Sequence, residues 1–192
     1  MDFFSLVQKT RSCRRFHQDP RVDTDLLKSL VNLSRLTASA ANLQPLKYVL
    51  SSDPEINTKI FDCLGWAGYL KNWPGPQPDE QPTGYIVMLG DQNIAKNVDM
   101  DIGIAAQTIM LGAYHHKFGG CMLANIRHQK LAESLEIDNH YKILLVLALG
   151  APKESIVINP MDTESDCRYF RDDQGVHHVP KRSLNDIIVH IY

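Results

Sequence analysis

Residues 11–16 read Arg11-Ser12-Cys13-Arg14-Arg15-Phe16, and residues 39–45 read Ser39-Ala40-Ala41-Asn42-Leu43-Gln44-Pro45. The first stretch packs three guanidinium groups and a hydroxyl into five residues. The second is a polar turn with two side-chain amides, and one amphipathic helix is predicted between the two stretches. Both ends of that helix can therefore face one ligand. Because a guanidinium matches phosphate oxygens in a two-point contact, the pair predicts a phosphorylated, planar cofactor.

Each stretch also has a plainer interpretation. The arginines lie where a first helix, expected at residues 2–9, ends, and basic groups at that position complement the helix dipole. Asn42 alone is typical of a residue that closes a helix in the left-handed conformation. The residues by themselves leave both alternatives open. Within the first stretch, we expect Phe16 to lie in the core and Arg15 to lie in solvent.

Composition restricts the class of protein. The 192 residues are 44% apolar and 22% charged with a net charge of −2, so we expect one globular domain, 1–192, with no attraction to nucleic acid or membrane. Neither a signal peptide nor an apolar run of membrane-spanning length is recognised. The four cysteines form no CxxC pair, which favours reduced thiols and a cytoplasmic location.

Hydrophobic periodicity and capping residues predict an α+β fold, with helices around a small sheet. Helices are expected at residues 2–9, 24–38, from Pro54 onward, 99–117, 128–135 and from Ser183 onward. Strands are expected at residues 48–50, 85–89, 121–124 and 143–149. Asp23 or Thr24 and then Asp53 are the expected N-caps. The helix at 99–117 is the most apolar, which favours a domain centre or a subunit interface. In the last helix, Ile187 and Ile188 are expected on the buried side.

Residues 65–84 hold four prolines, four glycines and both tryptophans. This composition predicts a loop, or a short helical turn followed by a loop. One interpretation is a proline-rich surface segment. The other is a wall or lid over a pocket, because two tryptophans are unusual on an exposed loop. The sequence does not choose between the two.

Motifs for metal, nucleotide and nucleophile chemistry are missing from the sequence. The histidines occur as adjacent pairs, which point about 100° apart on a helix and do not suit one metal ion. GxSxG, Walker and GxGxxG patterns do not occur, so hydrolase, P-loop and Rossmann functions lack support. Lys181-Arg182 forms a second basic cluster just before the helix that Ser183 is expected to cap. A helix start favours a bound phosphate, although surface charge is the default interpretation.

These motifs, taken in order, resemble the nitroreductase family of flavoproteins over almost the whole chain. The resemblance rests on Arg11-Ser12-x-Arg14-x-Phe16, Ser39-x-x-Asn42-x-Gln44-Pro45, Asp101-x-Gly103-x-Ala105-Ala106-Gln107, Gly119–Asn125, Ile143–Pro152 and Lys181-Arg182. It implies a mostly antiparallel sheet flanked by helices, in an intimate homodimer with FMN at the interface. It also implies electron transfer from NAD(P)H through flavin N5 to an electron-poor aromatic acceptor such as a nitroaromatic or a quinone.

The resemblance also implies roles for individual residues. Arg11 and Ser12 would hold the phosphate and ribityl chain, together with Lys181 or Arg182. Arg14 would approach the flavin pyrimidine edge and stabilise the reduced, anionic ring. The partner subunit would contribute Ser39, Ala40, Ala41, Asn42 and Gln44. Met122, Leu123, Ala124 and Asn125 would pass the flavin, the last two with backbone facing N5. The cofactor carries the chemistry, so no catalytic side chain and no metal is expected.

Three departures and two alternatives accompany the resemblance. Thr10 stands where many members have a second basic residue, Leu46 stands where an aromatic often follows Gln-Pro, and residues 65–84 replace a longer helical excursion. One alternative is a flavoprotein of the same fold with another task, such as dehalogenation or flavin fragmentation. The other is a non-catalytic module that binds a flavin or another nucleotide.

Overall fold

The computed structural model describes residues 1–161 and 166–192. These residues form two compact units. The first comprises Met1–Trp66 and Gly75–Lys153, and the second comprises Ala67–Pro74 and Glu154–Tyr192. The chain therefore enters the second unit twice, first for a short excursion and then for its C-terminal part.

The first unit is built on a five-stranded sheet in which every strand pair is antiparallel. Its strands are β1 (Phe16–His17), β2 (Leu46–Ser51), β3 (Gly84–Asp91), β4 (Gly119–Leu123) and β5 (Tyr141–Pro152). The order is β1-β5-β3-β2, and β4 also pairs with β5. All eight residues of β3 are buried, as its continuous apolar run predicts. The predicted α+β fold with an antiparallel sheet is confirmed.

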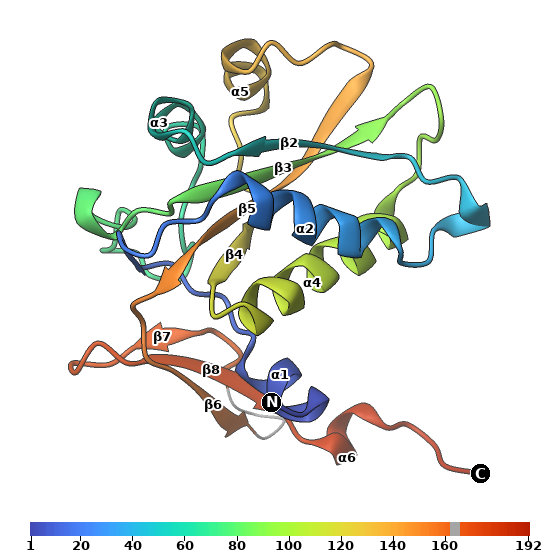
Figure 1. Cartoon of the computed structure of the whole chain (residues 1–192). Helices are drawn as coiled ribbons and strands as arrows, with labels where there is room; N and C mark the ends of the chain where they lie inside the picture. Colours follow the sequence, from blue (N-terminus) through green and yellow to red (C-terminus); the bar gives the residue numbers. More distant parts are fainter. Residues whose placement is uncertain (162–165) are drawn as a thin grey trace. The chain divides into compact units, whose positions relative to one another are not determined.

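Helices cover both faces of this sheet (Figure 1). They are α2 (Thr24–Arg35), α3 (Pro54–Phe61), α4 (Asp99–His115) and α5 (His128–Ser134), whereas α1 (Phe3–Lys9) contacts α4. Because successive strand residues point to opposite faces, Ile86 joins the core cluster under α2 and α4. Val87 joins the other cluster, under α3 and α5. A single central strand therefore supplies both cores.

Local signals set the starts of the helices but not every end. Asp23 caps α2 through the amide of Leu26, and Asp53 caps α3 with Pro54 at the first helical position, both as predicted. The second helix was predicted to end near Ala38, but α2 ends earlier, at Arg35. The chain leaves the helix early because residues 39–44 form a separate, irregular turn.

The second unit contains a three-stranded sheet that the sequence did not predict. Its strands are β6 (Ile156–Met161), β7 (Phe170–Arg171) and β8 (His177–Arg182); β6 pairs parallel to β8, and β7 pairs antiparallel to it. A single-turn helix, α6 (Leu184–Ile187), follows with a capping box between Ser183 and Asp186. The prediction that Ile187 and Ile188 lie on the buried side of the last helix was wrong. They are 60% and 41% exposed, and no residue of this four-residue helix is buried.

Candidate functional site

Arg11 follows α1 with its guanidinium only partly satisfied by the protein. Its Nη2 donates to the carbonyl of Val7 at 2.8 Å. Its Nε is buried and has no hydrogen-bond partner among the described residues. Burial lowers the pKa of this side chain, since removal from water disfavours the charged form. An anionic ligand stabilises a partly buried guanidinium that still has an open donor.

The next residues run beside the first residues of β4. Ser12, which is exposed, forms an isolated parallel bridge with Gly120, and the amide of Cys13 donates to the Gly120 carbonyl at 2.8 Å. Arg14 follows immediately and is buried, with 9% of its surface exposed. Phe16 lies fully in the core, as predicted. The fold therefore places the arginine segment next to the strand that leads into residues 122–125.

Residues 122–125 differ in whether their side chains are accessible to a ligand. Met122, Ala124 and Asn125 are exposed, whereas Leu123 is buried in the core under α3 and α5. Leu123 is therefore available to a ligand through its backbone alone. The carbonyl of Asn125 accepts a hydrogen bond from the amide of Gly65 at 2.8 Å. This contact joins the end of the β4 segment to the first residue of the proline-rich stretch.

Residues 39–44 form a turn under backbone strain. Ala41, Asn42 and Gln44 have φ values of 49°, 55° and 52°, the left-handed region that costs a non-glycine residue about 1–3 kcal/mol. The left-handed conformation predicted for Asn42 is confirmed, but α2 has already ended at Arg35, so Asn42 does not cap that helix. Strain of this kind persists only where the surroundings hold it, and it is concentrated at functional sites.

Asp101, in the first turn of α4, holds this turn in place. The residue is 4% exposed. Its carboxylate accepts a short hydrogen bond from the hydroxyl of Ser39 and a second hydrogen bond from the amide of Ala40 at 3.3 Å. The hydroxyl of Ser39 in turn accepts from the amide of Gln44 at 2.9 Å. Asp101 was part of the resemblance, but its structural role was not predicted. An acid beside the apolar residues of the 99–117 helix was the available signal.

A cavity of about 230 Å³ lies beside this turn. It is lined by residues of α2, of the segment between α2 and β2, of β2 and of α4: Ser34, Arg35, Thr37, Ala38, Ser39, Gln44, Leu46, Lys47, Tyr48, Asp101 and Ala105. Inside it, the hydroxyl of Ser34 lies 3.1 Å from the hydroxyl of Tyr48, and burial raises the pKa of that tyrosine. The cavity belongs to the same region as the predicted cofactor contacts at residues 39–44.

The expectation that Arg15 lies in solvent was wrong. Its Nε and Nη2 donate to the two carboxylate oxygens of Glu80 at 2.8 and 2.5 Å. The Nζ of Lys153 lies 3.0 Å from the same carboxylate, and these contacts lower the pKa of Glu80 to about 2. Glu80 lies 65 residues from Arg15 in the sequence, so the local sequence pattern around Arg15 does not reveal this partner.

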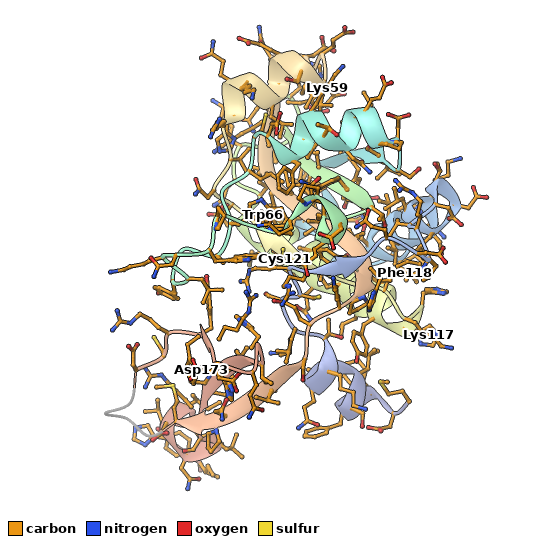
Figure 2. All side chains as sticks on the ribbon, turned by 90° about the vertical axis from the view of Figure 1, so that its left-hand side faces the viewer. Lys59, Trp66, Lys117, Phe118, Cys121 and Asp173 are labelled. Atoms are coloured by element: carbon orange, nitrogen blue, oxygen red, sulfur yellow. The ribbon has the colours of Figure 1, made fainter. Side chains whose placement is uncertain are left out.

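Residues 65–84 are divided between the two units instead of forming one loop. Trp66 packs beside Phe61 in the first unit, with ring centroids 5.5 Å apart, and is labelled in Figure 2. Trp73 belongs to the second unit, where the guanidinium of Arg171 lies 4.9 Å from its ring centroid. Residues 78–80 then form a 3-10 turn in the first unit. The two tryptophans therefore pack in separate environments.

Lys181 and Arg182 end β8 in the second unit and are exposed. Ser183 caps the helix that follows them, as predicted. Their contact with a phosphate stays a prediction. In the part of the chain that the structure describes, no helix is both long and apolar enough to cross a bilayer.

Comparison with known proteins identifies the family. Residues 7–74 and 76–151 match the profile described as the Nitroreductase family. A curated protein of Archaeoglobus fulgidus, named "Putative NADH dehydrogenase/NAD(P)H nitroreductase", is 25% identical over 153 residues, which are 76% of this chain and 83% of that protein. A nitroreductase family protein of Streptococcus pneumoniae TIGR4 has a TM-score of 0.72 at 16% identity, covering 99% of this chain and 100% of that one. An FMN-dependent nitroreductase of Clostridium difficile R20291 has a TM-score of 0.63 at 21% identity, over 80% of this chain and 89% of that one.

The chain belongs to the nitroreductase family, because the family profile covers most of its length. The solved structures share its α+β fold. The resemblance inferred from the arginine, amide and glycine motifs is thus confirmed. Membership supports an oxidoreductase activity.

Proposed function

We propose that this chain is an FMN-dependent oxidoreductase that takes electrons from NAD(P)H and passes them to an electron-poor aromatic acceptor. The observation that carries the proposal is Arg11, a partly buried guanidinium with an open Nε donor, followed at once by the exposed hydroxyl of Ser12. A phosphate is the ligand that such a pair recognises best. A phosphate contact of Lys181 or Arg182, which the resemblance implies, is part of the same proposal.

The remaining contacts are assigned by position. Arg14 would face the pyrimidine edge of the flavin, where a fixed positive charge favours the reduced ring. The exposed residues Met122, Ala124 and Asn125 and the backbone of Leu123 would line one side of the ring. Residues 39–42 and Gln44 would reach the ring from a second copy of the chain. When bound, FMN supplies the two-electron chemistry at N5, so the side chains bind, orient and exclude water.

The donor and acceptor follow the names of related proteins. The Archaeoglobus relative is named for both NADH and NAD(P)H, and one structural relative is named FMN-dependent. A nitroaromatic or a quinone suits the site because a flat, electron-poor ring can stack on a flavin. We propose no more specific acceptor.

A homodimer is part of this proposal, and exposed apolar side chains of the first unit support it. No residue of α1 is buried, and Phe3 and Phe4 are 73% and 77% exposed. Leu36, after α2, is 68% exposed, and Met100, at the start of α4, is 70% exposed. Apolar groups exposed at this level favour burial against another chain. A second copy is the partner we propose, since it would bring residues 39–44 to a neighbouring flavin.

The test is a pair of measurements on the purified protein. FMN is added, free flavin is removed, and the retained flavin per chain is measured by absorbance. NADH and NADPH oxidation is then followed with and without a quinone, relative to the rate in air alone. We expect retained flavin and a quinone-stimulated rate. Protein that retains flavin but shows no quinone stimulation would favour another task on the same fold, and protein that retains none would contradict the proposal.

A further inference from the structure

Glu80 is a buried carboxylate at the centre of a cluster of cations. Glu80 is only 6% exposed, although it lies in the proline-rich stretch, residues 65–84, that composition predicts to be a loop. Arg15 contacts both of its oxygens, at 2.8 and 2.5 Å. Lys153 lies 3.0 Å from one oxygen, and the exposed Asp79 lies 3.8 Å from the same lysine. Three segments distant in sequence therefore meet at one carboxylate.

The two cations are also joined through the backbone. The amide of Lys153 donates to the carbonyl of Arg15 at 2.9 Å, and the thiol of Cys13 donates to that same carbonyl at 3.2 Å. The amide of Cys13 is bound to the Gly120 carbonyl at 2.8 Å. Arg14 is thus the one residue between two anchored neighbours, Cys13 on the β4 side and Arg15 on the Glu80 side.

We propose that Glu80 is a positioning residue for the cofactor: by holding Arg15 and Lys153, it fixes the backbone around Arg14 and directs that guanidinium toward the bound flavin. The inference rests on the proposed function, because it requires FMN beside Arg14. It goes further in assigning a role to a residue outside the motifs that define the site.

Glu80 also determines which of the two adjacent guanidinium groups, Arg14 or Arg15, is available to the flavin. Arg14 and Arg15 are adjacent, and each guanidinium is able to bind an anion. The two-point contact with Glu80 engages Arg15, so the pyrimidine edge of the flavin meets Arg14 and not its neighbour. A neutral side chain at position 80 would leave Arg15 and Lys153 without this counter-charge and let the segment reorient. Binding groups held by their surroundings bind better than the same groups left mobile.

A double-mutant cycle on FMN affinity tests this role. The dissociation constant of FMN is measured by flavin fluorescence for the wild type, Glu80→Gln, Arg14→Ala and the double variant. We expect Glu80→Gln to weaken binding about tenfold when Arg14 is present and less than about twofold in the Arg14→Ala background. The control Asp79→Asn removes an exposed carboxylate near the same lysine and should leave FMN affinity within about twofold.

The measurement separates failure of the Glu80 proposal from failure of the proposed FMN function. Equal weakening by Glu80→Gln in both backgrounds would show a general structural role and overturn the proposal, as would an unchanged affinity. If Glu80→Gln does not fold, judged by circular dichroism without FMN, the same cycle is run with Arg15→Gln, which removes the same contact from the other side. Wild-type protein that does not bind FMN would refute the proposed function itself.

Discussion

Acid should destabilise this protein through Glu80, and the structure gives the size of the effect. The folded-state pKa of about 2 lies below the value of 4.5 for a free glutamate, because Arg15 and Lys153 stabilise the ionised form. At about 1.4 kcal/mol per pKa unit, the difference corresponds to about 3 kcal/mol. Since the folded-state pKa is the lower one, this stabilisation is complete well above pH 4.5 and is lost as the pH falls toward 2.

Urea unfolding of the wild type and Glu80→Gln at several pH values measures this directly. At pH 7 we expect Glu80→Gln to lower the free energy of unfolding by about 3 kcal/mol, and near pH 3 the difference should fall to about half. Asp79→Asn, the matched control, should change stability by less than about 1 kcal/mol, because that carboxylate is exposed. A wild-type advantage that is equal at pH 7 and pH 3, or smaller than about 1 kcal/mol at pH 7, would refute the reasoning.

Three further substitutions test other parts of the site. Arg11→Ala should weaken FMN binding by about tenfold to a hundredfold, measured by fluorescence titration, because a charge-assisted contact is worth about 1.5–3 kcal/mol; an unchanged affinity would remove Arg11 from the phosphate site. Ser39→Ala should speed hydrogen exchange at the amide of Gln44, which the hydroxyl binds at 2.9 Å, and unchanged protection would show that other contacts hold the turn. Gly120→Ala should lower the melting temperature, with a cost of about 1–3 kcal/mol. The added Cβ would lie 2.1 Å from the carbonyl oxygen of Ala148, so a variant as stable as the wild type would contradict the strand pairing.

Most of the first unit was predictable because its signals are local. The continuous apolar run around Ile86 predicts a central strand, and the Asp53-Pro54 pair predicts a helix start. Both appear where the sequence places them. The sheet of the second unit was missed because β7 and β8 hold few apolar residues, and because Pro160 in β6 and Pro180 in β8 remove backbone donors.

The candidate site was predictable in part, for a similar reason. The left-handed conformation of Asn42 follows from its chemistry and is confirmed, whereas the roles of Arg11 and Ser12 stay predictions from residue type and spacing. The two buried carboxylates that hold the turn at residues 39–44 and the Arg15 side chain were not recognised from the sequence. Asp101 lies 62 residues from Ser39, and Glu80 lies 65 residues from Arg15, so only the folded chain shows that each pair meets.

The central claim is that these residues form an FMN site, and the absorbance spectrum of the purified protein tests it most directly. The wild type is incubated with excess FMN, passed through a desalting column, and scanned for the flavin bands beside the Arg11→Ala variant. The account predicts that the wild type retains flavin in proportion to its chains and that Arg11→Ala retains less. Colourless wild-type protein that gains no flavin absorbance would contradict it.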